Sequence, residues 1–222
     1  FAKITKDYAM TQEITEKKNI TERLENGKIL PLIIKLSGPA VIAQLITFLY
    51  NIVDRMYVAR IKDAGTDALA ALGIVLPITL IIQAFSSLIG TGGAPRAGIK
   101  TGEGNFKEAG CIFNTASLLL AIIGVIIGGV TFIFAKEIIL LFGCPSSAVD
   151  FAVSYLKIYA VGTVFVMLAQ GLNSFILTQG YSFIAMGSVL IGAIFNIILD
   201  PIFIFTLGMG VKGSSLATVI SR

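Results

Sequence analysis

Histidine is absent from this sequence. Proton transfer near neutral pH therefore cannot use imidazole and would have to use a carboxylate. The same absence excludes histidine-based metal sites and Ser-His catalytic triads. Cysteine is almost absent too, since the chain has only Cys111 and Cys144. They are too few and too far apart to indicate a metal cluster, and we interpret both as small apolar packing residues.

Charge is also scarce, because only 14% of the residues are charged whereas 55% are hydrophobic. A soluble fold would need a polar face on every element, but most apolar stretches here are hydrophobic all round and about as long as a bilayer-spanning helix. We therefore predict an all-α, polytopic membrane helix bundle. The net charge of +4 is explained by basic residues that flank the spans on the cytoplasmic side, so we expect membrane lipid and no nucleic acid as a partner.

The apolar stretches predict about six transmembrane helices joined by short connections. The predicted spans cover approximately residues 29–58, 69–90, 111–134, 151–177 and 185–207, and a sixth begins after them. Residues 1–28 are polar and of mixed charge, without a signal-peptide pattern, and predict a cytoplasmic tail. Since the chain starts at Phe1 and stops inside the predicted sixth helix, we expect a fragment that contains one six-span unit, residues 29–222, incomplete at its C-terminal end.

Lysine and arginine counts favour an N-terminus in the cytoplasm, because the tail and the loop after the second span carry several basic residues. Arg60 and Lys62 in the first loop weaken this count. The second span is followed by "GTGGAPRAG". This run follows a span rather than a strand and lacks Gly-Lys-Ser/Thr, so we expect a turn at the membrane surface and not a phosphate loop.

Two carboxylates lie inside predicted spans, Asp54 in the first and Asp200 in the fifth. Placing a charged side chain at mid-bilayer costs at least about 2.5 kcal/mol, so such acids usually face a cavity or a partner and take part in ion or substrate chemistry. Asn196 is four residues before Asp200 and shares its helix face, where an amide oxygen and a carboxylate can bind the same cation. Pro201 leaves a backbone carbonyl one turn back without its usual donor.

Further polar side chains recur at helical spacing near these acids and supply hard oxygen donors, which suit Na⁺ or a proton held between carboxylates. They are Thr47, Tyr50 and Asn51 in the first span, Gln170 and Asn173 in the fourth, and Ser214, Ser215 and Thr218 in the sixth.

Each of these residues also has a purely structural interpretation. Asp54 precedes Arg55 and would pair with it, and Asp200 would be a neutral acid hydrogen-bonded to a neighbouring helix. The amide and hydroxyl side chains would join helices to one another. Lys157 is interpreted as an end residue whose ammonium group reaches the membrane surface.

Four separated motifs resemble the N-terminal half of the multidrug and toxic compound extrusion (MATE) transporters, in the branch found in Firmicutes. They are "NIVDRMYVARI", "GTGGAPRAGIKTGEGNFKEAG", "NIILDPIFIF" and "GVKGSSLATVIS", in the order expected over the spans. The turn "LTQGYSFIAM" departs from many relatives, because it keeps the glycine and lacks an arginine.

The resemblance implies the N-lobe of a twelve-helix antiporter in the plasma membrane. Such a protein exports organic, often cationic, drugs in exchange for Na⁺ or H⁺ by alternating access, without a cofactor, and needs the C-terminal lobe that this chain lacks. The cation-binding residues implied by the resemblance are Asp54, Asn173, Asn196, Asp200 and Thr218. If the ion is Na⁺, Asp54 and Asp200 would be its metal ligands. Thr47, Tyr50, Asn51 and Gln170 remain candidates for the substrate cavity.

Three other functions are compatible with a membrane bundle. A flippase for a lipid-linked precursor, from the same superfamily, would need a cavity lined with basic residues, and the spans offer little beyond Lys157 and Arg55. An intramembrane enzyme would need a catalytic motif that this sequence does not contain, so no enzymatic activity is expected. In a purely structural membrane subunit, Asp54 and Asp200 would have no partners on a water-filled cavity.

Overall fold

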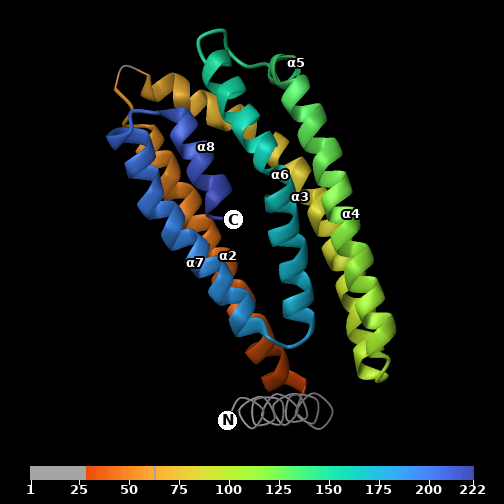
Figure 1. The fold of residues 1–222 in the computed structure, drawn as a ribbon. Helices are drawn as coiled ribbons and strands as arrows, with labels where there is room; N and C mark the ends of the chain where they lie inside the picture. The colour runs from red at the N-terminus through yellow and green to blue at the C-terminus, as the bar shows by residue number, and fades with distance from the viewer. Residues whose placement is uncertain (1–28, 63) are drawn as a thin grey trace, which may run out of the picture.

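The computed structural model describes residues 29–222 except Asp63, with side chains described from Ser37 onward. Every regular element in these residues is a helix, as Figure 1 shows. The helices are α2 (Ile29–Val58), α3 (Gly65–Gly102), α4 (Phe106–Ile133), α5 (Ala135–Leu141), α6 (Val149–Thr178), α7 (Ser182–Pro201), the π-helix η1 (Ile202–Thr206) and α8 (Val211–Ile220). The predicted tail, residues 1–28, lies outside the described residues.

Five of these helical segments are long and apolar enough to cross a membrane. They lie in α2, α3, α4, α6 and the continuous α7–η1 segment, and correspond to the five complete spans predicted from the sequence. The sixth predicted span begins as α8, which has 10 residues. The prediction of an all-α, polytopic membrane bundle is therefore confirmed.

The turn predicted at "GTGGAPRAG" is wrong, because α3 continues through this run to Gly102. At 38 residues the helix is about 57 Å long. Its glycines serve close helix packing: a Cβ atom at Gly90 would lie 2.8 Å from the carbonyl oxygen of Gly171 on α6, and one at Gly93 would lie 3.0 Å from the ring of Phe175. The chain instead turns at residues 103–105, where Gly104 has a positive φ of 76° and Asn105 caps α4 by accepting from the Glu108 N–H.

Helix α6 lies between two groups of helices (Figure 1). On one side it packs along α3 and α4, and on the other it contacts α8 and the end of α7, while α2 packs along α7. Most of the apolar core lies on the α3–α4 side and is formed by α3, α5 and α6, with Leu120 from α4. The side that faces α2, α7 and α8 is the one that carries the candidate site.

The fifth span changes geometry directly after Asp200. Helix α7 ends at Pro201, and the next turn is the π-helix η1, closed by a hydrogen bond from the Leu207 N–H to the Ile202 carbonyl at 2.9 Å. Pro201 has no N–H to donate, so one α-helical hydrogen bond is missing where the geometry changes. The backbone is therefore irregular next to the buried acid, an arrangement often found at functional sites.

Candidate cation-binding site

Two buried carboxylates face each other between α2 and α7. Asp54 is 8% exposed and Asp200 is fully buried. The two helices pack along one another, and the carboxyl groups lie close enough to interact directly. We call them the carboxylate pair. When both are ionised they repel each other, and neither has a hydrogen to donate.

The two acids differ in their hydrogen-bond partners. Asp54 Oδ1 accepts a hydrogen bond of 2.7 Å from the Ser214 hydroxyl of α8. Both oxygens of Asp200 are buried and have no donor among the described residues. Asp54 does not pair with Arg55, because the ion pairs within residues 37–222, Asp63 aside, join Lys100 to Glu103 and Glu108. The alternative of an Asp54–Arg55 ion pair is thus contradicted. Asp200, whose oxygens accept no hydrogen bond from the described residues, is the less stabilised of the two acids.

Asn196 lies one turn before Asp200 on α7 and is 1% exposed. Neither its Nδ2 nor its Oδ1 has a hydrogen-bond partner in the described part of the chain. A buried amide without a hydrogen-bond partner costs free energy, and an amide that joined two helices would have such a partner. Asn196 has none among the described residues, so a structural link between helices does not explain its burial. Its position leaves an amide oxygen available beside the carboxylate pair.

The other two residues implied for the cation site come from α6 and α8. Thr218 is 8% exposed and lies one turn after Ser214. Asn173 is half-buried; its Nδ2 donates to the Ala185 carbonyl over a long 3.5 Å, whereas its Oδ1 is buried without a partner. Asn173 therefore joins α6 to the first turn of α7, about 22 Å along that helix from Asp200, so the structure does not bring it to the carboxylate pair.

Two tyrosines that the sequence analysis passed over also reach this region. Tyr155 and Tyr159 on α6 are buried, and their rings stack at a centroid distance of 6.4 Å. The hydroxyl of Tyr159 has no partner within the described residues, and the backbone carbonyl of Tyr155 accepts a hydrogen bond of 2.8 Å from the Ser215 hydroxyl of α8. Their four-residue spacing places both on one helix face, and this repeat is the signal that would have identified them.

Only two of the four candidates for the substrate cavity line the same cavity. Thr47 and Asn51 line a cavity of about 730 Å³ along α2, which Leu177 of α6 also borders. Both use their donors on their own helix: Thr47 Oγ1 donates to the Ala43 carbonyl, and Asn51 Nδ2 donates to the Thr47 carbonyl at 2.7 Å. Among the described residues no hydrogen bond joins Asn51 to Asp54, although their spacing allowed one.

The other two, Tyr50 and Gln170, lie away from that cavity. The hydroxyl of Tyr50 is buried without a partner, and its ring lies beneath the guanidinium group of Arg222 at 5.6 Å. Gln170 is half-buried; its Nε2 donates to the Ser87 hydroxyl at 3.3 Å and its Oε1 is unpartnered.

The buried side-chain atoms that lack a hydrogen-bond partner in the described structure are spread along three helices and do not form one cluster. All of them belong to α2, α6 and α7, on the residues Tyr50, Tyr159, Gln170, Asn173, Asn196 and Asp200. Most are oxygens, the atoms that Na⁺ and protons bind in proteins. The oxygens of Asn196 and Asp200, which lie at the carboxylate pair, therefore fit a small hard cation or a proton.

Lys157 and Arg55, the basic residues that a pyrophosphate-binding cavity would need, are both exposed. The ammonium group of Lys157 lies 5.8 Å from the ring centroid of Phe132 on α4, on the far side of α6 from the carboxylate pair. This position agrees with its interpretation as a residue that reaches the membrane surface.

Known proteins resemble this chain in both sequence and structure. Among curated proteins, it is 28% identical over 198 residues to the multidrug export protein MepA of Staphylococcus haemolyticus, and covers 43% of that protein. It is 26% identical over 194 residues to an FAD transporter of Shewanella oneidensis, and covers 42% of it. These matches extend over 89% and 86% of the chain.

A solved structure of the MATE multidrug transporter DinF-BH superimposes with a TM-score of 0.82 at 33% identity. The superposition covers 90% of this chain and 44% of that one. The chain thus spans less than half the length of the relatives it matches.

The sequence profile of the MatE family matches residues 39–202, which include both acids, Asn173 and Asn196. This match extends over more than half of the chain and agrees with the resemblance found from the motifs. The chain therefore belongs to the MatE family.

Proposed function

We propose that this chain is the N-terminal lobe of a cation-coupled multidrug efflux antiporter in the cell membrane. The observation that carries the proposal is the carboxylate pair, two acids from distant parts of the chain that meet inside a membrane bundle. The names of the relatives support a role in export, because MepA is named for multidrug export and DinF-BH for multidrug transport.

The coupling ion is Na⁺ or H⁺. Either one would relieve the repulsion within the carboxylate pair: Na⁺ by bridging the oxygens, and a proton by turning one acid into a donor for the other. Asn196 and Thr218 would complete the shell with neutral oxygens, whereas Asn173 lies beside Ala185, about 22 Å from Asp200 along α7, and is not part of this shell. Asp200 would gain most, because its oxygens have no donor in the described residues.

Binding of this ion would couple to the shape of the lobe through three helices. Asp54 belongs to α2, Asp200 to α7, and Ser214, which donates to Asp54, to α8. An ion that binds one arrangement of these helices more tightly than another shifts the population toward it. If the drug favours the other arrangement, drug and ion displace each other, as an antiporter requires.

The substrates would be organic molecules, often cationic. The buried charges of the carboxylate pair favour positive ligands, and the cavity along α2 offers Thr47 and Asn51 among apolar side chains such as Phe48 and Leu45. Alternating access would need a second lobe, and the N-terminus would lie in the cytoplasm.

The flippase alternative gains no support from MepA or the FAD transporter, because these relatives are named for drug export and FAD transport. An enzymatic role gains none either.

Transport by the full-length protein in sealed vesicles tests this function. We expect efflux of a cationic dye to follow an imposed Na⁺ or pH gradient, and Asp200→Asn to abolish that dependence. Asp150→Asn is the matched control, because Asp150 is an exposed acid in the first turn of α6 and should leave coupling unchanged. Full coupled transport by Asp200→Asn would contradict the proposal.

A further inference from the structure

Helix α5 is a short element of two unlike faces at one end of the bundle. Ala135 and Ile139, four residues apart, are completely buried in the apolar core, where α5 packs against α6. Lys136 and Glu137 between them are exposed, and so are Leu140 and Leu141 at the C-terminal end. The core therefore fixes one face of α5 and leaves a mixed, largely apolar surface outside.

The exposed apolar side chains of α5 continue on both flanks of the helix. Leu141 is 84% exposed, the highest value among the large hydrophobic residues described, and Ile133 reaches 71%. Phe134 and Phe142 are exposed as well. Isolated exposed apolar residues are common, but a run of this kind marks an interaction surface, since exposed apolar area is unfavourable in water.

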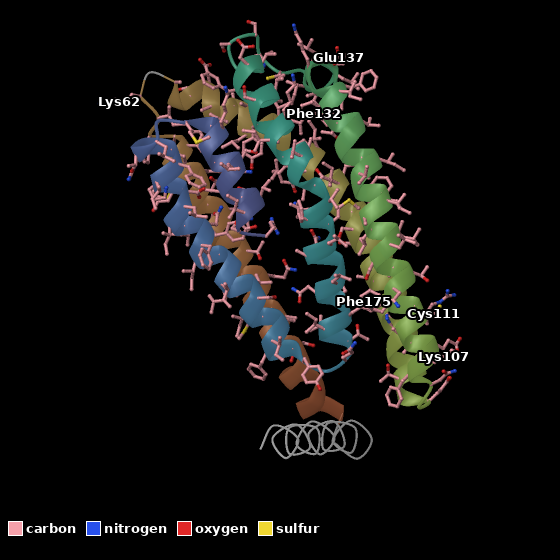
Figure 2. All side chains as sticks on the ribbon, in the orientation of Figure 1. Lys62, Lys107, Cys111, Phe132, Glu137 and Phe175 are labelled. Carbon is pink, nitrogen blue, oxygen red and sulfur yellow. The ribbon has the colours of Figure 1, made fainter. Side chains whose placement is uncertain are left out.

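The depth of α5 in the membrane follows from α4. Exposed large apolar side chains recur along α4 over residues 113–133, and about 20 residues of α-helix rise about 30 Å, the thickness of the hydrocarbon core. Charged residues lie beyond both ends of this stretch: Lys107 and Glu108 on one side, and Lys136 and Glu137 on the other. Figure 2 shows Lys107 and Glu137 at opposite ends of the bundle. Helix α5 thus starts where the hydrocarbon core ends.

Lys157 independently indicates the same boundary. Its ammonium group lies over the ring of Phe132, one turn before α5, and its side chain is exposed. Lysine stems commonly run along apolar surface while the charge reaches the headgroups, and aromatic rings concentrate at this depth.

From this arrangement we propose that residues 132–142 form an interfacial anchor, a segment that inserts into the boundary between acyl chains and headgroups of one leaflet. The apolar side chains of Ile133, Phe134, Leu140 and Leu141 would enter the acyl region. The ammonium groups of Lys136 and Lys157 would contact lipid phosphates. A lipid leaflet fits this surface for two reasons. The surface continues the lipid-facing surface of α4 without interruption, and it ends in cations that complement phosphate charge.

Spin labels in the full-length protein, reconstituted in phosphatidylcholine–phosphatidylglycerol vesicles, test the anchor. In a background in which Cys111 and Cys144 are replaced, single labels are attached to Leu141→Cys and, as a matched control on the same helix, to Glu137→Cys. We expect the ratio of O₂ to water-soluble nickel-complex accessibility to be severalfold higher at position 141 than at 137. Unchanged thermal unfolding midpoints would show that both variants fold.

Equal accessibility to the nickel complex at both positions would contradict the anchor, because Leu141 would then lie in water. Protection of position 141 from both reagents would also contradict it, since the surface would then be covered by protein. Dipolar broadening between labels would identify that protein as a second copy. The variant Ile133→Cys provides the same measurement at a second site if Leu141→Cys is not recovered.

Discussion

The two sides of helix α6 differ in the polar groups that they bury. Toward α3 and α4 the contact is close and apolar: a Cβ atom at Gly90 would lie 2.8 Å from the Gly171 carbonyl, and one at Gly128 only 2.7 Å from the Ala160 carbonyl. Toward α8 glycine packing is close as well, since a Cβ atom at Gly162 would overlap Val219, but this side also buries Asp54, Asn196 and Asp200. Asn196 and Asp200 have no hydrogen-bond partners among the described residues. We call α3 and α4 with the adjoining face of α6 the glycine-packed side, and α2, α7 and α8 the polar side.

This difference indicates which side can change shape. Close approach of small residues maximises van der Waals contact between membrane helices and leaves little room for movement. Buried polar atoms without partners leave a free-energy cost that a ligand can remove. We therefore infer that the polar side is the one that responds to the coupling ion.

The largest expected effect is ion-dependent stability on the polar side. A cation at about 100 times its Kd adds about 2.7 kcal/mol to the free energy of unfolding. We expect the purified full-length protein to gain stability from either Na⁺ or added protons, and Asp200→Asn to lose that gain. Thermal unfolding midpoints across Na⁺ concentrations at two pH values measure it. The same response in Asp200→Asn as in the unmodified protein would disprove the inference.

A second, somewhat smaller effect is expected on the glycine-packed side. Gly128→Ala would force a methyl group against the backbone of α6, and overpacking of this kind costs about 1–3 kcal/mol. Gly129→Ala is the control, because no atom lies within 4 Å of the added methyl group there. Thermal unfolding midpoints in detergent should fall for the first variant only. Similar midpoints for both would mean that α4 and α6 are not packed this closely.

The smallest expected effect is the loss of one hydrogen bond from a buried serine, which can be compared between the two sides. Ser86 donates to the Met167 carbonyl on the glycine-packed side, and Ser214 donates to Asp54 on the polar side. Each alanine substitution should cost about 1 kcal/mol for the lost hydrogen bond. Only Ser214→Ala should also change the concentration of ion that gives half-maximal transport, because Ser214 contacts the carboxylate pair. An equal change in Ser86→Ala would remove the distinction between the sides.

Much of the candidate site could be predicted from single helices. Burial of a charge in an apolar span is costly wherever the helix lies, so Asp54 and Asp200 stood out before any contact was known. The spacing of Asn196 and Asp200 also placed both on one face, and the structure buries both. Tyr159 was missed because a tyrosine in a span is ordinary until its hydroxyl is found buried without a partner in the described structure.

The run "GTGGAPRAG" was misinterpreted for a related reason. Glycine and proline interrupt helices in water, and the local sequence of α3 therefore indicated a turn. In the structure the helix continues, because Gly90 and Gly93 allow α6 to approach closely and the packing compensates for poor helix propensity. The partner helix supplies that compensation, and its position cannot be read from the run itself.

By itself the sequence determined the membrane class, the approximate spans, the buried acids and the family, since each follows from hydropathy, spacing or a local motif. Only the tertiary structure decided that Asp54 meets Asp200, that Ser214 donates to one acid and not to the other, and that α5 leaves its apolar end exposed. These features depend on contacts between segments far apart in the chain. Such contacts are fixed by the way whole helices pack, which no local pattern of residues specifies.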